Sequence, residues 1–248
     1  RGLPLQAVQR FFPEIAAGGF TRVDGTIEFY SRVNALLKDD MTVVDYGAGR
    51  GVGPREDPVP YRRELRTLQG KCQRLIGVDV DEAVLSNPAV DEAYKIDLGD
   101  ALPLPDASVD MVVSDWVLEH VDAPEALAKE MSRVLKPGGW FCARTPNRWG
   151  YIGLGANLVP NQWHQRFLKH LQPQKKDVDT FPTAYRMNTK ARLKSYFPEA
   201  SFEQTIYGHF GEPAYFGQSV FVWSLVLISF RLTPERFAPV LMAFLRRR

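Results

Sequence analysis

The sequence predicts an α/β protein built on a doubly wound, largely parallel sheet. Runs of β-branched residues alternate with helical patterns over residues 41–145. The first run leads directly into a glycine turn, as a strand does when it delivers the chain to a ligand. The chain has 248 residues, which suits one large domain better than two. We therefore expect one sheet with helices on both faces and a ligand beyond the carboxyl ends of its strands.

The elements follow in order. A helix is expected over residues 26–37, because apolar residues recur there at helical spacing after Asp24. Residues 41–45 form a β-branched run that ends in an acid and enters the glycines. The same signals predict six more strands, near 74–79, 93–96, 109–114, 140–144, 201–207 and 240–245. Further helices are expected at 61–68, 81–86, 123–135 and 189–196.

The helix at 123–135 has the strongest end signals. Asp122 is placed to cap it and Pro124 lies in its first turn. Its apolar residues recur along one face until the Lys-Pro-Gly-Gly sequence at 136–139 ends it. We therefore expect this helix to cover one face of the sheet.

Composition narrows the classes of function. Lysine and arginine number 31 against 29 acids, a formal charge of +2, which is too small for non-specific nucleic-acid binding. Cys72 and Cys142 form neither a disulfide framework nor a metal site of usual spacing. We therefore expect a cytoplasmic protein without metal or nucleic-acid partner. The chain starts at Arg1, which leaves a removed targeting segment open, and the oligomeric state is open as well.

One uncharged stretch of the chain bears on the expectation of a cytoplasmic protein. Residues 213–230 carry no charge over 18 positions, the lower limit for a bilayer span, but the continuous apolar part is only 220–230. The favoured interpretation is a packing helix within an insertion at about 214–231. Contact with a membrane surface is the alternative, in which Trp223, Arg231 and the terminal arginines at 246–248 would take part.

The central motif is a glycine loop that follows an acid, Asp45-x-Gly47-x-Gly49-x-Gly51. Glycines after a strand let the backbone turn sharply and approach a ligand closely. The loop lacks the Gly-Lys-Ser/Thr end of a P-loop, and its spacing fails the dinucleotide fingerprint. A carboxylate at this strand end repels phosphate and attracts a cation. The motif therefore favours a ligand with an ammonium or sulfonium group.

Four ordered segments resemble class I S-adenosylmethionine-dependent methyltransferases, of the type 11 kind. The first is the glycine loop, and the second is the strand at 75–81, which again ends in acids. Residues 96–106 are similar to the family's Gly-Asp-Ala segment. Residues 109–139 match its fourth strand, the following helix and the Leu-Lys-Pro-Gly-Gly turn. A Pro-rich and Arg-rich insertion at 53–70 departs from the family pattern, and its arginines suit a solvated helix face better than an anion site.

The resemblance implies a Rossmann-like seven-stranded sheet with an antiparallel last strand and a helical cap between strands five and six. It implies S-adenosyl-L-methionine as cofactor, with Asp79 accepting hydrogen bonds from the ribose diol. Asp97 is the first choice for contact with the adenine amino group, and Asp100 the second. The residues expected to bind cofactor are Asp45, Gly47, Ala48, Gly49, Asp79, Val80, Asp97, Leu98 and Ser114.

Methyl transfer needs alignment of the acceptor, and a base if the acceptor is a hydroxyl. His120 is the first candidate for that base and His164 is the alternative, with Asp115 as a supporting acid. The competing interpretation is that His120 is a helix residue that only packs or caps. His164 lies in 147–187, an aromatic-rich connection that we expect to cover the acceptor, although aromatics that only fill a core would look the same.

The predicted organisation is a single methyltransferase domain over 1–248. It comprises a helical lead-in at 1–40, a cofactor-binding core at 41–145, the acceptor-side cap at 147–187 and C-terminal strands and helix at 188–248. The predicted activity is O-methylation of a small molecule, a sugar or a lipid-linked glycan. The alternatives are a non-catalytic cofactor-binding subunit and a peripheral membrane enzyme that methylates a lipid. A nicotinamide oxidoreductase is disfavoured by the failed fingerprint.

Overall fold

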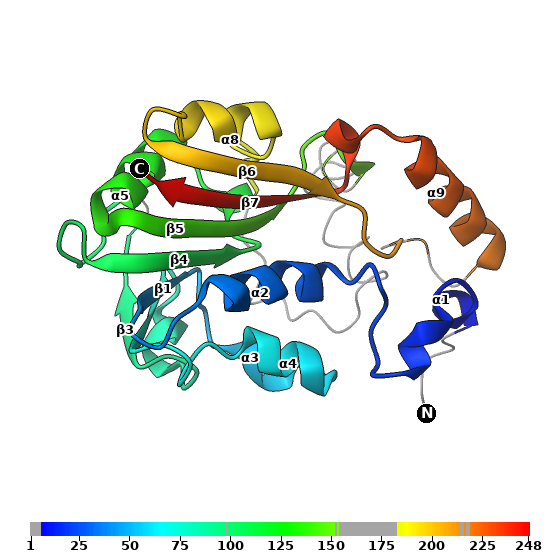
Figure 1. Ribbon diagram of the computed structural model, residues 1–248, viewed down its shortest axis with the longest axis horizontal. Coiled ribbons are helices and arrows are strands. Elements are labelled where there is room, and N and C mark those ends of the chain that lie inside the picture. Colours follow the sequence, from blue (N-terminus) through cyan, green and yellow to red (C-terminus); the bar gives the residue numbers. More distant parts are fainter. Residues whose placement is uncertain (1–5, 98, 152, 154–182, 214–215, 217–218) are drawn as a thin grey trace.

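A mixed β-sheet forms the centre of the protein. The computed structural model describes residues 6–97, 99–151, 153, 183–213, 216 and 219–248 (Figure 1). The described strands form a seven-stranded sheet of order β3-β2-β1-β4-β5-β7-β6. Their bounds are β1 Thr42–Tyr46, β2 Arg74–Asp79, β3 Glu92–Lys95, β4 Val109–Asp115, β5 Leu135–Pro146, β6 Phe202–His209 and β7 Val240–Arg247.

Strand directions confirm the predicted fold class. β1 pairs in parallel with both β2 and β4, while β7 inserts antiparallel between β5 and β6. β5 is longer than predicted, because the Lys-Pro-Gly-Gly residues at 136–139 belong to it. The ladder between β4 and β5 shifts register between Val109 and Met111, where the chain enters β5 directly from the helix.

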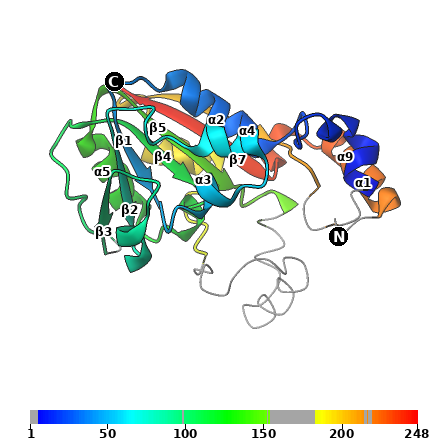
Figure 2. The ribbon, with the colours of Figure 1, turned by 90° about the horizontal axis from the view of Figure 1, so that it is seen from below.

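Helices cover both faces of the sheet, as Figures 1 and 2 show. α2 packs on one face, where Phe29, Tyr30 and Val33 join one buried cluster with strand residues. α5 and α8 pack on the other face in a second cluster. Among the described residues, the helices are α1 Gln6–Phe11, α2 Gly25–Leu36, α3 Val52–Glu56, α4 Pro60–Arg66, α5 Pro124–Val134, α8 Lys190–Tyr196 and α9 Val220–Leu232, with 3₁₀ turns at Pro13–Ala16, Glu82–Ser86, Leu118–His120 and Glu235–Phe237.

Asp24 caps α2, whereas the capping of α5 by Asp122 that the sequence predicts is wrong. The Asp24 carboxylate accepts hydrogen bonds from the backbone N–H of Thr26, at 2.8 Å, and of Ile27, at 3.1 Å. The N-cap of α5 is Ala123, which has no side chain to accept such a bond. Asp122 lies one residue too early and instead approaches Arg186 at 3.3 Å. The Pro at the start of α5 already removes one of the free N–H groups that a cap would satisfy.

Two arginines of the insertion at 53–70 hold α4 in place through ion pairs with aspartates outside the helix. The Arg62 guanidinium lies 2.9 Å from the carboxylates of both Asp57 and Asp24. Arg66 pairs with Asp57 at 3.4 Å. These two arginines therefore have a structural role. The expectation that they lie on a solvated helix face is wrong.

α9 packs only in part. Trp223 is buried and stacks on Phe11 of α1 at a ring-centroid distance of 6.2 Å. Its burial removes it from the surface contact considered above, and the arginines at 246–248 end β7 at the opposite end of the sheet from α9 (Figure 1). Among the described helices none is long and apolar enough to cross a bilayer.

The buried face of α5 yields the first prediction. We expect Met131→Ala to lower the free energy of unfolding by about 2–5 kcal/mol, because Met131 is fully buried against the sheet and its loss leaves a cavity. Urea unfolding measures the change. Lys129→Ala, two residues earlier on the exposed side of the same helix, should change it by less than about 0.5 kcal/mol. Equal losses in the two variants would contradict the packing described.

Candidate functional site

A cleft of about 670 Å³ opens at the carboxyl ends of β1, β2 and β4. Its walls come from the glycine turn after β1, the segments that follow β2 and β3, the 3₁₀ turn after β4 and the first turns of α5. This is the edge at which parallel sheets bind ligands. Its lining includes Gly47, Gly49, Asp79, Val80, Asp97, Asp100, Asp115, Trp116, Val117, Glu119, His120, Asp122 and Glu130.

The glycine turn brings backbone, not side chains, to the cleft. Gly47 has φ +88° and Gly49 has φ +47°, in the left-handed region that L-residues rarely adopt. A Cβ on Gly47 would collide with the Val117 side chain on the opposite wall. The Gly47 N–H donates to the Val78 carbonyl at 2.8 Å, which ties the turn to β2. Glycine at 47 is therefore required both by the backbone conformation and by the close approach of Val117.

Asp79 is held by the backbone on the cleft floor. One carboxylate oxygen accepts the Gly49 N–H and the other accepts the Asp81 N–H, both at 2.8 Å. A carboxylate has about four acceptor positions, so two bonds fix its orientation and leave about two. The two remaining acceptor positions match the two hydroxyl donors of a vicinal diol.

The cleft is strongly acidic. Its described lining holds seven carboxylates and neither lysine nor arginine. Glu130 pairs with Arg133 at 2.5 Å, and Asp115 and Asp122 also have arginine partners. Asp79, Asp97 and Asp100 form no ion pair with any described residue. The cleft therefore favours a cationic ligand and disfavours a phosphate-rich one.

Three of the residues expected to bind cofactor do not belong to the described lining of the cleft, and a fourth is not among the described residues. Asp45, Ala48 and Ser114 are absent from its described lining, and Leu98 is outside the described residues. Burial, together with the neighbouring Asp115 carboxylate, raises the pKa of Asp45 to about 7. The buried Ser114 hydroxyl has no hydrogen-bond partner among the described residues. The other five expected residues, Gly47, Gly49, Asp79, Val80 and Asp97, line the cleft.

An arginine holds the Asp115 carboxylate in a fixed orientation. The Arg144 guanidinium donates to its two carboxylate oxygens at 2.6 and 2.7 Å, and to Thr26 Oγ1 at 3.1 Å. Its centre lies 5.6 Å from the Phe29 ring centroid and 5.5 Å from that of Trp116. Both members of the pair are at most 10% exposed. This geometry supports an anchoring role for Asp115.

Arg144 also holds the backbone of the cleft wall. Its carbonyl accepts the Trp116 N–H at 2.9 Å, and Trp116 has φ +60°, which is unusual for a bulky residue. The sequence did not identify Arg144 as part of the site; there it is only the last residue of the strand expected at 140–144. The available signal was a charged residue among buried neighbours, because such a residue requires a partner.

His120 and Glu119 form the far wall. His120 ends the 3₁₀ turn Leu118–His120 and lines the cleft. Glu119 is buried, and its carboxylate accepts the Thr145 hydroxyl at 3.0 Å. The Asn188 amide in turn donates to Thr145 Oγ1 at 2.6 Å. His164 lies outside the described residues, as does most of the cap expected at 147–187.

Comparisons with known proteins identify methyltransferases as relatives of this chain. Residues 61–143 match the family model of the methyltransferase domain. The chain is 42% identical over 131 residues to a protein named "Probable S-adenosylmethionine-dependent methyltransferase" from Mycolicibacterium smegmatis, covering 51% of this chain and 46% of that one. A protein of the same name from Mycobacterium tuberculosis is 37% identical over 102 residues, covering 39% of this chain and 36% of its own. The chain thus spans about half, or less, of the length of the curated relatives it matches.

Solved structures share the fold. A putative methyltransferase from Haloferax volcanii, solved in a complex with the Trm112 methyltransferase activator, superimposes with a TM-score of 0.56 at 20% identity, covering 90% of each chain. A Thermotoga maritima protein described as an S-adenosylmethionine-dependent methyltransferase superimposes with a TM-score of 0.55 at 17% identity, covering 97% of this chain and 96% of its own. These similarities support the fold.

The Asp115–Arg144 pair yields the second prediction. We expect Arg144→Gln to lower the free energy of unfolding by about 3–5 kcal/mol, because it leaves a buried carboxylate without its counter-charge. Adding Asp115→Asn should recover part of the loss. Urea unfolding of the single and double variants measures the coupling. Arg32→Gln, which breaks an exposed pair with Glu28, should cost less than about 1 kcal/mol; a similar cost at both sites would refute the anchoring role.

The raised pKa of Asp45 yields the third prediction. Between pH values of about 4 and about 7 the folded protein holds a proton on Asp45 that the unfolded chain has released. The free energy of unfolding of the wild type, relative to Asp45→Asn, should therefore fall as the pH rises through this range and stay constant above it. Other titrating groups are common to both proteins and cancel. Chemical unfolding at stepped pH measures the difference, and a flat difference would contradict the assignment.

Proposed function

We propose that this chain, which belongs to the class I S-adenosylmethionine-dependent methyltransferases, transfers a methyl group to an oxygen of a small molecule or glycan. The observation that carries the proposal is the acidic cleft floor, where backbone N–H groups orient Asp79 beside a left-handed glycine turn. A nucleoside with a positively charged sulfur fits both the space and the charge of this cleft.

The residues present fit that cofactor. Asp79 would accept hydrogen bonds from the ribose hydroxyls with its remaining lone pairs. The backbone of Gly47 and Gly49 lines the cleft and would lie against the amino-acid part, and Asp97 or Asp100, which line the cleft beyond β3, would meet the adenine amino group. When bound, S-adenosylmethionine supplies an electrophilic methyl group. The unpaired carboxylates would stabilise the positive charge of its sulfonium.

The same charges argue against the rival ligands. A nicotinamide dinucleotide or a nucleoside triphosphate brings phosphates, which need N–H donors or cations around them. The described cleft lining offers seven carboxylates and no lysine or arginine to meet them. A redox or phosphoryl-transfer role is therefore the weaker proposal.

The protein's own part in the reaction is alignment and proton removal. The cleft walls hold the acceptor in line with the donor and exclude water, which can supply roughly 7–11 kcal/mol of a barrier. His120 lines the cleft and would take the proton of an acceptor hydroxyl. The Arg144 pair keeps Asp115 and the Trp116 backbone in place, so that the wall beside the acceptor is rigid.

A lipid is the second candidate acceptor, and one observation favours it. α9 follows β6 at the carboxyl edge of the sheet, the edge that carries the cleft, and its outward side chains are apolar and exposed. An acceptor that resides in a membrane would meet the cleft at this edge.

The cofactor proposal is tested by binding. We expect Asp79→Asn to weaken binding of S-adenosylhomocysteine by about tenfold or more, because hydrogen bonds to a charged acceptor are worth about 1.5–3 kcal/mol. Titration calorimetry measures the dissociation constant. Asp106→Asn is the matched control, since that carboxylate is 79% exposed, lies outside the cleft lining and should leave binding unchanged. Tight binding of NAD in place of S-adenosylhomocysteine would end the proposal.

The base is tested by turnover. We expect His120→Ala to reduce methylation of hydroxyl acceptors by about 10²–10⁴-fold, the usual contribution of a general base. Affinity for S-adenosylhomocysteine should change little. A panel of sugars, phenols and alcohols, assayed by release of S-adenosylhomocysteine, provides the readout. Undiminished turnover would exclude His120 as the base, and wild-type cofactor binding without turnover on any acceptor would favour a non-catalytic subunit.

A further inference from the structure

α9 presents an apolar row to solvent. Phe221, Leu225, Ile228 and Leu232 recur at intervals of four, three and four residues, which places them on one side of the helix. Their exposed fractions are 72%, 52%, 54% and 80%. A helix on the surface of a globular protein normally places polar residues on its outer side. This set, here called the outer row, therefore marks a contact with something apolar.

The helix is held firmly while its outer row stays exposed. Its inner side carries Trp223, which is buried with Ala7 and Phe12 in a small apolar cluster of its own. Leu227 packs against the same cluster. The outer row is thus not the loose surface of a poorly packed helix, because the opposite side has the packing that a fixed position requires.

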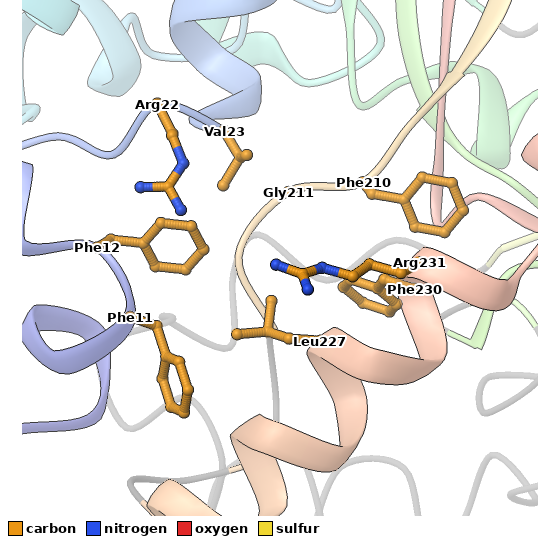
Figure 3. Close-up of a pocket in the computed structure, with 9 residues that line it drawn as sticks. All are labelled: Phe11, Phe12, Arg22, Val23, Phe210, Gly211, Leu227, Phe230 and Arg231. Atoms are coloured by element: carbon orange, nitrogen blue, oxygen red, sulfur yellow. The ribbon is translucent and has the colours of Figure 1, made fainter.

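Positive charge lies beside the outer row. α9 has one charged residue, Arg231, which follows the outer row about a quarter of a turn around the helix. Figure 3 shows the Arg231 and Arg22 side chains extending over one pocket between α9 and the N-terminal segment. Arg22 pairs with Glu14 at 3.0 Å, whereas Arg231 forms no ion pair with a described residue.

The pocket itself is apolar below these cations. It measures about 290 Å³ and is lined by Phe11, Phe12, Phe210 and Phe230, among others. A basic side chain at the flank of an apolar face is the arrangement that interfacial helices use, since its stem stays in apolar surroundings while the charge reaches phosphate groups. The charge pattern therefore complements an anionic lipid surface.

The size of the outer row argues against a second copy of the chain. A stable protein interface uses roughly 20–30 residues on each side. The outer row supplies four, on a helix of 13 residues. A membrane requires no such area, because four large apolar side chains and one cation are enough for a weak, reversible contact.

We propose that α9 binds the surface of an anionic phospholipid membrane, with the outer row in the acyl region and Arg231 at the level of the phosphates. This role is independent of methyl transfer, because it uses none of the cleft residues. It would bring the carboxyl edge of the sheet, and with it the cleft, toward the bilayer.

Vesicle flotation of the whole chain tests the proposal without cofactor. We expect the protein to float with phosphatidylcholine vesicles that contain about a quarter phosphatidylglycerol, and less with pure phosphatidylcholine. Raising the salt concentration from about 0.05 M to about 0.5 M should weaken the binding. Ile228→Glu should lower the partition coefficient by about tenfold or more, and Arg231→Gln by about fivefold on the anionic vesicles alone.

Leu85→Glu is the matched control, because Leu85 is 55% exposed and lies on the 3₁₀ turn Glu82–Ser86, away from α9. It should bind vesicles as the wild type does, and circular dichroism confirms the folding of each variant. Failure to float, or equal losses in Ile228→Glu and Leu85→Glu, would overturn the proposal. Concentration-dependent dimerisation that Ile228→Glu abolishes, without flotation of the wild type, would overturn it in favour of a second copy.

Discussion

Repulsion between carboxylates at adjacent strand ends is the constraint on which the site depends. β2, β1 and β4 are neighbours in the sheet, and each places an acid at its carboxyl end: Asp79, Asp45 and Asp115. Three like charges on neighbouring strands are tolerated only if each is compensated. The protein uses a different means for each of them.

Asp115 receives a buried guanidinium, Asp79 receives two backbone N–H groups, and Asp45 retains its proton up to a pH of about 7. The three solutions have different consequences for a ligand. The guanidinium neutralises its carboxylate and makes it part of the wall. The N–H groups hold Asp79 in the cleft lining with no cationic partner among the described residues, so the negative potential is concentrated where a cationic nucleoside would lie.

The carboxyl edge of the sheet thus carries two features of different chemistry. The cleft is acidic, whereas α9 beyond β6 is apolar and flanked by arginine. An acidic cleft would repel an anionic membrane, and the positive charge of Arg231 on α9 would offset part of that repulsion at short range. The packing of Trp223 on Phe11 fixes this helix through the N-terminal segment, far from it in sequence.

Local patterns in the chain were enough to predict the strands, the glycine turn and the acids that end β1 and β2, because period-two alternation and backbone φ requirements act over a few residues. They could not reveal that Arg144 pairs with Asp115, that Arg62 pairs with Asp24, or that Asp79 lines the cleft while Asp45 is absent from its described lining. Each of these depends on residues brought together from distant positions. Whether a charge is buried, paired or open to a ligand is settled by its three-dimensional neighbours, and a one-dimensional pattern does not contain them.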